Sequence, residues 1–145
     1  MLKHIDPLLS PRLLAILRAM GHGDEIAIVD ANFPAASHAA RLVRFDGVPA
    51  PRLLDAVLSV MPLDDFVAVA AFRMLVVGDA NAEVPIYADF RATLARHEVG
   101  KAAILGGLDR HAFYARAKSA YAIAATGETR LYGNILLTKG VVRPG

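Results

Sequence analysis

A histidine flanked by two glycines is the residue of this chain best suited to chemistry. His22 lies within residues 20–25, MGHGDE, where the glycines permit positive φ angles and leave little bulk around the imidazole. An imidazole exists in both protonation states near neutral pH, so it can donate and accept a proton. We interpret His22 as a candidate for proton transfer, although a turn between a helix and a strand would also favour glycine.

Asp30 is a second candidate because of its place relative to a predicted strand. Residues 25–29, EIAIV, are typical of a short buried strand, and Asp30 follows directly. In a layered α/β fold, ligands bind outside the carboxyl ends of the strands. Asp30 and the predicted loop 31–37 therefore occupy a ligand-binding position; the alternative is an acid that only caps the loop.

Arg110 and the stretch Tyr132-Gly133-Asn134 are further candidates. Arg110 follows Asp109, which is the predicted N-cap of a helix over residues 109–119. A cation in the first turn opposes the helix dipole, so we expect a ligand or an acidic neighbour to compensate, with plain exposure to solvent as the alternative. Glycine beside asparagine is also common in hairpin turns.

Hydrophobic periodicity predicts four helices and six strands around these residues. The helices are expected at 11–20, where Ser10 caps and Gly21 ends the helix, and at 51–61, 84–97 and 109–119. The strands are expected at 25–29, 41–45, 66–77, 101–105, 120–126 and 135–138. The stretch 66–77 is apolar on both faces, which favours a central strand covered by helices, although the start of a buried helix would look similar.

This alternation predicts an α/β fold over a single domain, residues 1–145. We expect three layers, with a mixed β-sheet in the middle and helices on both faces. The last two strands are predicted to form an antiparallel hairpin across the turn 127–133.

His22 precedes the strand that Asp30 ends, so the two residues should lie near its opposite ends. At about 3.3 Å per residue, this separation is roughly 20 Å. If both residues act in one site, either the His22 loop folds back or the site forms between neighbouring subunits.

The composition favours an oligomer and excludes several classes of function. Hydrophobic residues make up 55% of the 145 residues and the mean hydropathy is +0.40, which indicates either an unusually full core or apolar surface that another subunit covers; a homo-oligomer is the simpler explanation. The formal net charge of +2 is spread along the chain, and no basic block indicates nucleic acid binding. The absence of cysteine excludes disulfides and thiolate chemistry.

Neither a membrane segment nor a metal site is expected. The longest apolar run, 66–77, contains Arg73 and is shorter than the roughly 20 residues that span a bilayer. The first seven residues, MLKHIDP, do not resemble a secretory signal, so a cytoplasmic location is the default expectation. The other four histidines have no metal-ligand spacing, and we interpret them as surface or packing residues.

Several linked motifs make the chain resemble the fucose mutarotase and ribose pyranase family. The motifs are the helix that starts at Ser10-Pro11, residues 21–25 (GHGDE), 30–35 (DANFPA), 112–114 (AFY), 126–128 (TGE) and 132–137 (YGNILL). They occur in order over nearly the whole length, and the segment 110–114 favours the fucose branch. Members of this family interconvert the ring forms of free monosaccharides.

The resemblance implies a role for each candidate residue. It makes His22 the catalytic proton donor, and it makes Asp30, Arg110, Tyr132, Gly133 and Asn134 the residues that bind the sugar. Asp30 binds hydroxyl groups or holds the imidazole tautomer in this interpretation, and Tyr132 is an alternative second acid or base. It also implies a ring-shaped homo-oligomer, often a decamer, and an isomerase that needs no cofactor.

Alternative functions remain at this point. The chain has Asn32 where the fucose branch commonly has histidine, and residues 68–82 match only loosely. A ribose pyranase-like activity and a non-catalytic sugar-binding protein are the alternatives to a mutarotase acting on L-fucose. A phosphocarrier that uses His22 is disfavoured because no phosphate-binding loop is present.

Overall fold

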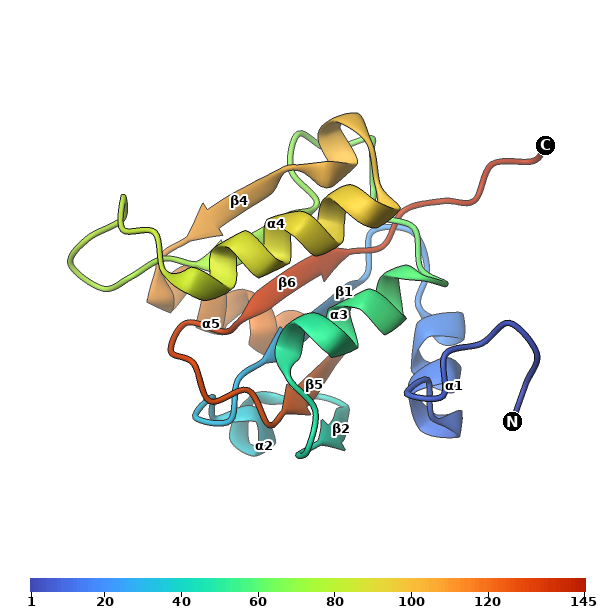
Figure 1. The fold of residues 1–145 in the computed structure, drawn as a ribbon, viewed down its shortest axis with the longest axis horizontal. Helices are drawn as coiled ribbons and strands as arrows, with labels where there is room; N and C mark the ends of the chain where they lie inside the picture. The colour runs from blue at the N-terminus through green and yellow to red at the C-terminus, as the bar shows by residue number, and fades with distance from the viewer.

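A six-stranded β-sheet forms the middle layer of the molecule (Figure 1). The computed structural model describes residues 1–145, and the order of strands across its sheet is β2-β5-β1-β6-β3-β4. Strand β6 is antiparallel to both of its neighbours, β1 and β3, whereas all other pairs are parallel. The strands are β1 (Glu25–Val29), β2 (Leu42–Phe45), β3 (Ala71–Met74), β4 (Leu105–Leu108), β5 (Ala122–Thr126) and β6 (Ile135–Thr138).

Helices cover both faces of this sheet, which confirms the predicted three-layer α/β fold with a mixed sheet. One face packs against α1 (Pro11–Ala19), α3 (Ala50–Leu58) and α4 (Pro85–His97), and the other against α2 (Ala35–His38) and α5 (Arg110–Ser119). A short 3₁₀ helix, η1 (Gly100–Ala103), precedes β4. None of the helices combines the length and the apolar character needed to cross a bilayer.

The side chains of β1 alternate between two separate hydrophobic clusters. Ile26 and Ile28 belong to the cluster under α1, α3 and α4, whereas Ala27 and Val29 belong to the cluster under α2 and α5. This alternation follows from the period of two in a strand, and residues 26–29 of β1 are buried on both faces of the sheet. A strand paired on both edges and packed on both faces is a rigid support for the residues at its ends.

Helix α1 begins as the sequence predicts and ends differently. The Ser10 hydroxyl accepts a hydrogen bond from the Leu13 amide at 3.2 Å, and proline occupies the first turn. The chain leaves the helix through Met20 in an extended conformation. Gly23, with φ of 88°, rather than Gly21 adopts the left-handed conformation, so the predicted glycine cap at residue 21 is wrong.

The predicted hairpin of the last two strands is also wrong. Strand β1 lies between β5 and β6, with Ile28 opposite Ala124 on one side and Ile135 on the other. The turn 127–133 therefore crosses over the end of β1. Local turn signals indicate where a chain reverses, but they do not indicate which strand fills the gap.

Three other predicted segments differ from the structure. Within 66–77 only Ala71–Met74 forms a strand, and the apolar side chains at both ends of the run, Phe66 and Val77, are exposed. Residues 100–103 form η1, and the strand that was expected at 101–105 begins only at Leu105. The predicted loop 31–37 contains the start of α2.

The antiparallel β6 decides which residues gather at each edge of the sheet. Asp30 follows β1 and Arg110 follows β4, so both lie at the edge formed by the carboxyl ends of the parallel strands. Because β6 runs the other way, the residues that precede it, 132–134, reach this same edge. His22 precedes β1, and Lys139 follows β6, so they lie at the opposite edge.

We predict that Gly127→Ala destabilises the fold strongly. A Cβ at this position would lie 2.0 Å from the Asp46 carbonyl oxygen, which is backbone and cannot move aside easily. Overpacking of this kind costs about 1–3 kcal/mol or more of unfolding free energy. Gly47→Ala is the matched control, because a Cβ there meets no atom within 4 Å. Urea unfolding of both variants measures the difference, and equal stabilities would contradict the prediction.

Candidate sugar-binding site

A cavity of about 190 Å³, with polar groups set among apolar side chains, opens at the carboxyl edge of the sheet; we call it the polar cavity for the groups it offers to a ligand. It brings together four residues that the sequence analysis selected: Asp30, Arg110, Tyr132 and Asn134. Gly133 lies between the last two and donates its backbone N–H to an Asp30 oxygen at 3.2 Å. Five of the six candidates are therefore assembled within one chain.

The Asp30 carboxylate lies at the base of this cavity and is almost fully buried. One oxygen accepts the Asn32 amide at 3.0 Å, and the other accepts the Gly133 amide. Burial raises the pKa of Asp30, although these backbone N–H groups act in the opposite direction. Each oxygen keeps a lone pair that can accept a hydrogen bond from a ligand hydroxyl.

Asn134 connects the end of β1 to the start of β6. Its side-chain oxygen accepts the backbone N–H of Asp30 at 2.8 Å, and its side-chain nitrogen lies 3.9 Å from the Met74 sulfur. The amide group is therefore oriented by Asp30 and β3 before any ligand binds. Since sulfur is a weak acceptor, the side-chain nitrogen retains donor capacity toward the cavity.

Tyr132 lies on the cavity wall in an unusual backbone conformation. Its φ angle is 61°, a left-handed value that a bulky residue rarely adopts. The phenol oxygen accepts the Val77 amide at 3.1 Å, which leaves its own O–H free to donate. At the next residue, Gly133, a Cβ would lie 2.8 Å from the Glu128 side chain, so only glycine fits.

Glu128 holds the turn that carries these residues. Its buried carboxylate accepts the amides of Ala50 at 3.2 Å and Arg130 at 3.1 Å, and it pairs with the Arg130 guanidinium at 3.0 Å. Burial raises its pKa, but the hydrogen bonds from Arg130 outweigh that effect, and the pKa of Glu128 is lowered. The Glu128 carbonyl also accepts the Ala31 amide at 2.9 Å, which links the turn to the loop after Asp30.

Arg110 is exposed at the cavity rim and has no acidic partner. Its Nε donates to the Tyr114 hydroxyl at 3.3 Å, and its guanidinium lies 5.2 Å from the centre of that ring. No carboxylate lies within 4.0 Å of it, and the capping Asp109 is engaged by the Ala112 amide. Of the two expected compensating groups, the acidic neighbour is absent, and Arg110 is an exposed cation that lines the cavity available for a ligand.

His22 lies apart from this cavity, at the opposite edge of the sheet. Its Nε2 is 3.1 Å from Oδ1 of Asp64, a buried residue in the segment between α3 and β3. The Phe66 ring lies 5.2 Å from the imidazole, measured between centroids. The structure therefore excludes a loop that folds back over β1.

The His22 loop is fixed at both ends by backbone hydrogen bonds. Gly23 donates to the Lys139 carbonyl and Lys139 donates to the Asp24 carbonyl, both at 2.9 Å. The Asp24 carboxylate accepts the Gly21 amide at 2.8 Å. These contacts leave the imidazole half exposed on a loop with a defined conformation.

Several residues around the two sites are not predicted from the sequence. Nothing in the sequence around Asp64 indicates that it contacts a histidine 42 positions away. Apolar side chains form much of the cavity wall, and their spacing in sequence gives no signal. Asn32 and Phe33 belong to the loop 31–37, which the sequence placed at a ligand-binding position, whereas the lining residues Met74, Val77, Tyr114 and Leu131 were not expected there.

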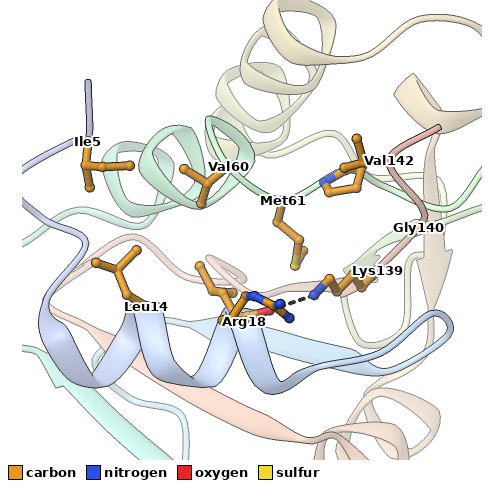
Figure 2. A pocket seen from close by; sticks show the side chains of 10 residues that line it. Ile5, Leu14, Arg18, Val60, Met61, Lys139, Gly140 and Val142 are labelled. Carbon is orange, nitrogen blue, oxygen red and sulfur yellow. Dashed lines mark hydrogen bonds between the residues drawn. The ribbon is translucent and has the colours of Figure 1, made fainter. Parts of the chain in front are cut away.

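Two other cavities differ in chemistry. One of about 580 Å³ adjoins the polar cavity, since Val77 and Arg110 line both. Another, of about 340 Å³, lies between α1 and the C-terminal segment and has mainly apolar walls (Figure 2). The Lys139 ammonium group in this cavity is engaged by the Leu17 carbonyl at 2.7 Å, and Arg18 also lines the wall.

The sheet order and the polar cavity at its carboxyl edge define a small α/β ligand-binding protein. The chain belongs to the RbsD / FucU transport protein family, whose model matches residues 3–142. This membership confirms the family predicted from the motifs.

Proteins similar to this one align with almost its entire length. A fucose mutarotase from Bos taurus is 46% identical over 99% of this chain and 95% of its own length. The crystal structure of a Streptococcus pneumoniae fucose mutarotase in complex with L-fucose is 48% identical, with a TM-score of 0.90 over 98% of this chain and 100% of that chain. The Bacillus subtilis RbsD structure complexed with D-ribose shares the fold, with a TM-score of 0.74 at 20% identity over 99% and 100% of the two chains.

We predict that Asp30 makes stability decrease as the pH rises. Because its pKa is raised in the folded state, the folded protein binds this proton more tightly than the unfolded chain. Asp30 therefore contributes most to folding stability at pH values below its unfolded-state pKa. This contribution is lost as the pH rises through the folded-state pKa of Asp30. Melting temperatures of Asp30→Asn should therefore fall less than those of wild type between about pH 4 and pH 8.

Asp65→Asn is the control of opposite sign. The hydrogen bond from Arg143 lowers the pKa of the Asp65 carboxyl, so that group favours folding more as the pH rises. The melting temperature of Asp65→Asn should therefore rise less with pH than that of wild type. Melting curves of Asp30→Asn that run parallel to wild type would contradict the prediction for Asp30.

Proposed function

We propose that the protein is an L-fucose mutarotase, an isomerase that interconverts the α and β anomers of the free sugar. The observation that carries this proposal is the polar cavity of Asp30, Arg110, Tyr132 and Asn134. The likeness to the fucose mutarotase with bound L-fucose supports the choice of sugar. The reaction requires an acid and a base, and no cofactor.

The cavity residues bind the sugar in this proposal. The Asp30 carboxylate accepts hydrogen bonds from hydroxyl groups, and the Arg110 guanidinium donates to oxygen atoms. Tyr132 and Asn134 donate through a phenol and an amide that their protein partners already orient. The Gly133 N–H holds the Asp30 carboxylate in place.

We infer that the active site is completed by a neighbouring subunit, which supplies His22. Within one chain, His22 and Asp30 lie at opposite ends of β1. Large apolar side chains are exposed beside both: Phe66 next to His22, and Val77 and Leu131 next to the Asp30 cavity. Exposed apolar groups beside two incomplete half-sites favour a contact between subunits. We propose a ring-shaped homo-oligomer, a decamer, as its assembled form.

The chemistry is a balanced exchange of two protons. His22 donates a proton to the ring oxygen as the bond between C1 and this oxygen breaks, and Asp30 accepts the proton of the anomeric hydroxyl. The open-chain aldehyde then rotates about the C1–C2 bond, and the reverse transfers close the ring on either face. The raised pKa of Asp30 suits a carboxylate that must accept a proton.

We predict that His22→Ala slows anomer exchange by about 10² to 10⁴-fold, the usual contribution of general acid–base catalysis. Saturation-transfer NMR on L-fucose measures the rate, with D-ribose and galactose as comparison sugars. His4→Asn is the control, because His4 is exposed and its left-handed φ of 61° suits asparagine. Unchanged exchange in the His22 variant would remove its catalytic role, and faster exchange of D-ribose than of L-fucose would favour a ribose pyranase.

A mixing experiment tests the shared site. His22→Ala and Asp30→Asn subunits should each be nearly inactive, and the Asp30 variant should also bind sugar about 10- to 100-fold more weakly. After the two are unfolded and reassembled in equal amounts, about a quarter of the sites combine an intact Asp30 with a neighbour's intact His22. Activity should return to about a quarter of the wild-type level, whereas no recovery would place both residues in one chain's site.

A further inference from the structure

We propose that Asp64 is a positioning residue for His22, which fixes the imidazole so that Nδ1 is the nitrogen presented to the sugar. This inference rests on the proposed function, because it assigns the reacting atom of the proposed proton donor. It begins from the asymmetry of the pair: the His22 side chain is 45% exposed, and the Asp64 side chain is 4% exposed.

The Asp64 carboxylate is itself held in place. The backbone N–H of Asp64 donates to the Thr138 carbonyl at 3.0 Å, and the preceding residue, Leu63, forms a β-bridge with Lys139. The Phe66 amide donates to Oδ1 at 3.0 Å, the same oxygen that lies 3.1 Å from the imidazole. Because the support is backbone, the oxygen has a fixed position at the edge of the sheet.

This contact determines which imidazole nitrogen carries hydrogen. A carboxylate only accepts hydrogen bonds, so Nε2 must be the protonated nitrogen of neutral His22. Nδ1 has no hydrogen-bond partner within the chain. In the neutral ring Nδ1 is therefore the free base, and in the imidazolium it carries the proton that can be given to the sugar.

Phe66 restricts the ring further. The Phe66 ring is tilted by 51° against the imidazole, and the two ring centroids are 5.2 Å apart. The Arg143 guanidinium lies 5.3 Å from the centroid of the same phenyl ring. Arg143 is fixed in turn by two hydrogen bonds to Asp65, at 2.9 and 3.0 Å. A rotation of the imidazole away from Asp64 would have to displace this stack.

The proton balance follows directly. Nδ1–H of the imidazolium gives its proton to the ring oxygen as the C1–O bond breaks, while Nε2–H stays bonded to Asp64. On ring closure the proton returns from the same oxygen to Nδ1. Asp64 keeps its hydrogen bond to Nε2–H throughout, and the buried carboxylate serves to orient the ring.

The test combines a spectroscopic measurement with kinetics on the full-length protein. Two-dimensional ¹⁵N NMR of the imidazole at alkaline pH should show the Nε2–H tautomer of His22 in wild type. Asp64→Ala should give a mixture of tautomers and lower kcat by about 10²-fold, the cost of a misplaced reacting group, with KM for L-fucose nearly unchanged because Asp64 does not touch the sugar.

Asp64→Asn separates geometry from charge. Its amide oxygen can replace Oδ1 and accept from both Nε2 and the Phe66 amide, so the tautomer should persist and part of the activity should remain. Asp46→Asn is the control, since this exposed carboxylate binds Arg44 at 2.8 Å and contacts neither His22 nor the residues around it. It should leave the tautomer unchanged. Melting curves confirm that each variant is folded.

Two outcomes would overturn the assignment. One is an unchanged tautomer and kcat in Asp64→Ala; the other is an altered tautomer with wild-type kcat, since the orientation would then have no effect on catalysis. If wild type shows the Nε2–H tautomer and Asp64→Ala loses it, but wild type exchanges no sugar anomers, the proposed mutarotase function fails while the Asp64 contact stands. The two failures are therefore distinguishable.

Discussion

The antiparallel insertion of β6 between β1 and β3 is the constraint on which the rest of the structure depends. It directs the start of β6 to the edge where the parallel strands end, and it places Asn134 within 2.8 Å of the Asp30 backbone. If β6 paired with β5 instead, the turn 127–133 would not cross the end of β1. Asp30, which follows β1, and residues 132–134, which precede β6, thus share one cavity because β6 runs antiparallel to β1.

The cavity carries polar groups that a purely structural core would not contain. Asp30 is buried without a cationic partner, and Tyr132 adopts a left-handed backbone conformation. Such features lower stability and persist only where the surroundings determine them. Here the surroundings are backbone N–H groups and the Glu128–Arg130 pair, which supply directed hydrogen bonds. The fold therefore stabilises a site that remains costly by itself, which is typical of functional positions.

The sequence predicted what depends on local pattern. The buried strand at 25–29, the Ser10-Pro11 start of α1 and the Asp109 cap were confirmed because strand composition and helix capping are local properties. The pairing of β5 and β6 was wrong because it depends on which distant strand fills the space between them. The prediction of one central strand over 66–77 was wrong for a related reason. The two ends of this apolar run are exposed beside the two half-sites, so their hydrophobicity does not indicate burial within the chain.

The same reasoning applies to the candidate site. Asp30 and the loop after it could be placed at the carboxyl edge in advance, because ligands bind outside the strand ends in this class of fold. Their grouping with Arg110 and residues 132–134 came from the resemblance to the family. The contact of Asp64 with His22 could not, since it joins positions 42 residues apart through a bridge between Leu63 and Lys139. Tertiary contacts of this kind have no local signature.

The stiffness of β1 explains why the chain by itself cannot complete the proposed site. This strand pairs with β5 and β6 and is buried on both faces, so it holds Asp30 and His22 apart at a fixed distance. The His22 loop is bonded to Lys139, and the imidazole is held by Asp64 on the same side. In the proposed oligomer, each half-site is thus ordered before the subunits associate. Association then has only to fix the position of one rigid edge against another, and little conformational entropy is lost in forming the complete site.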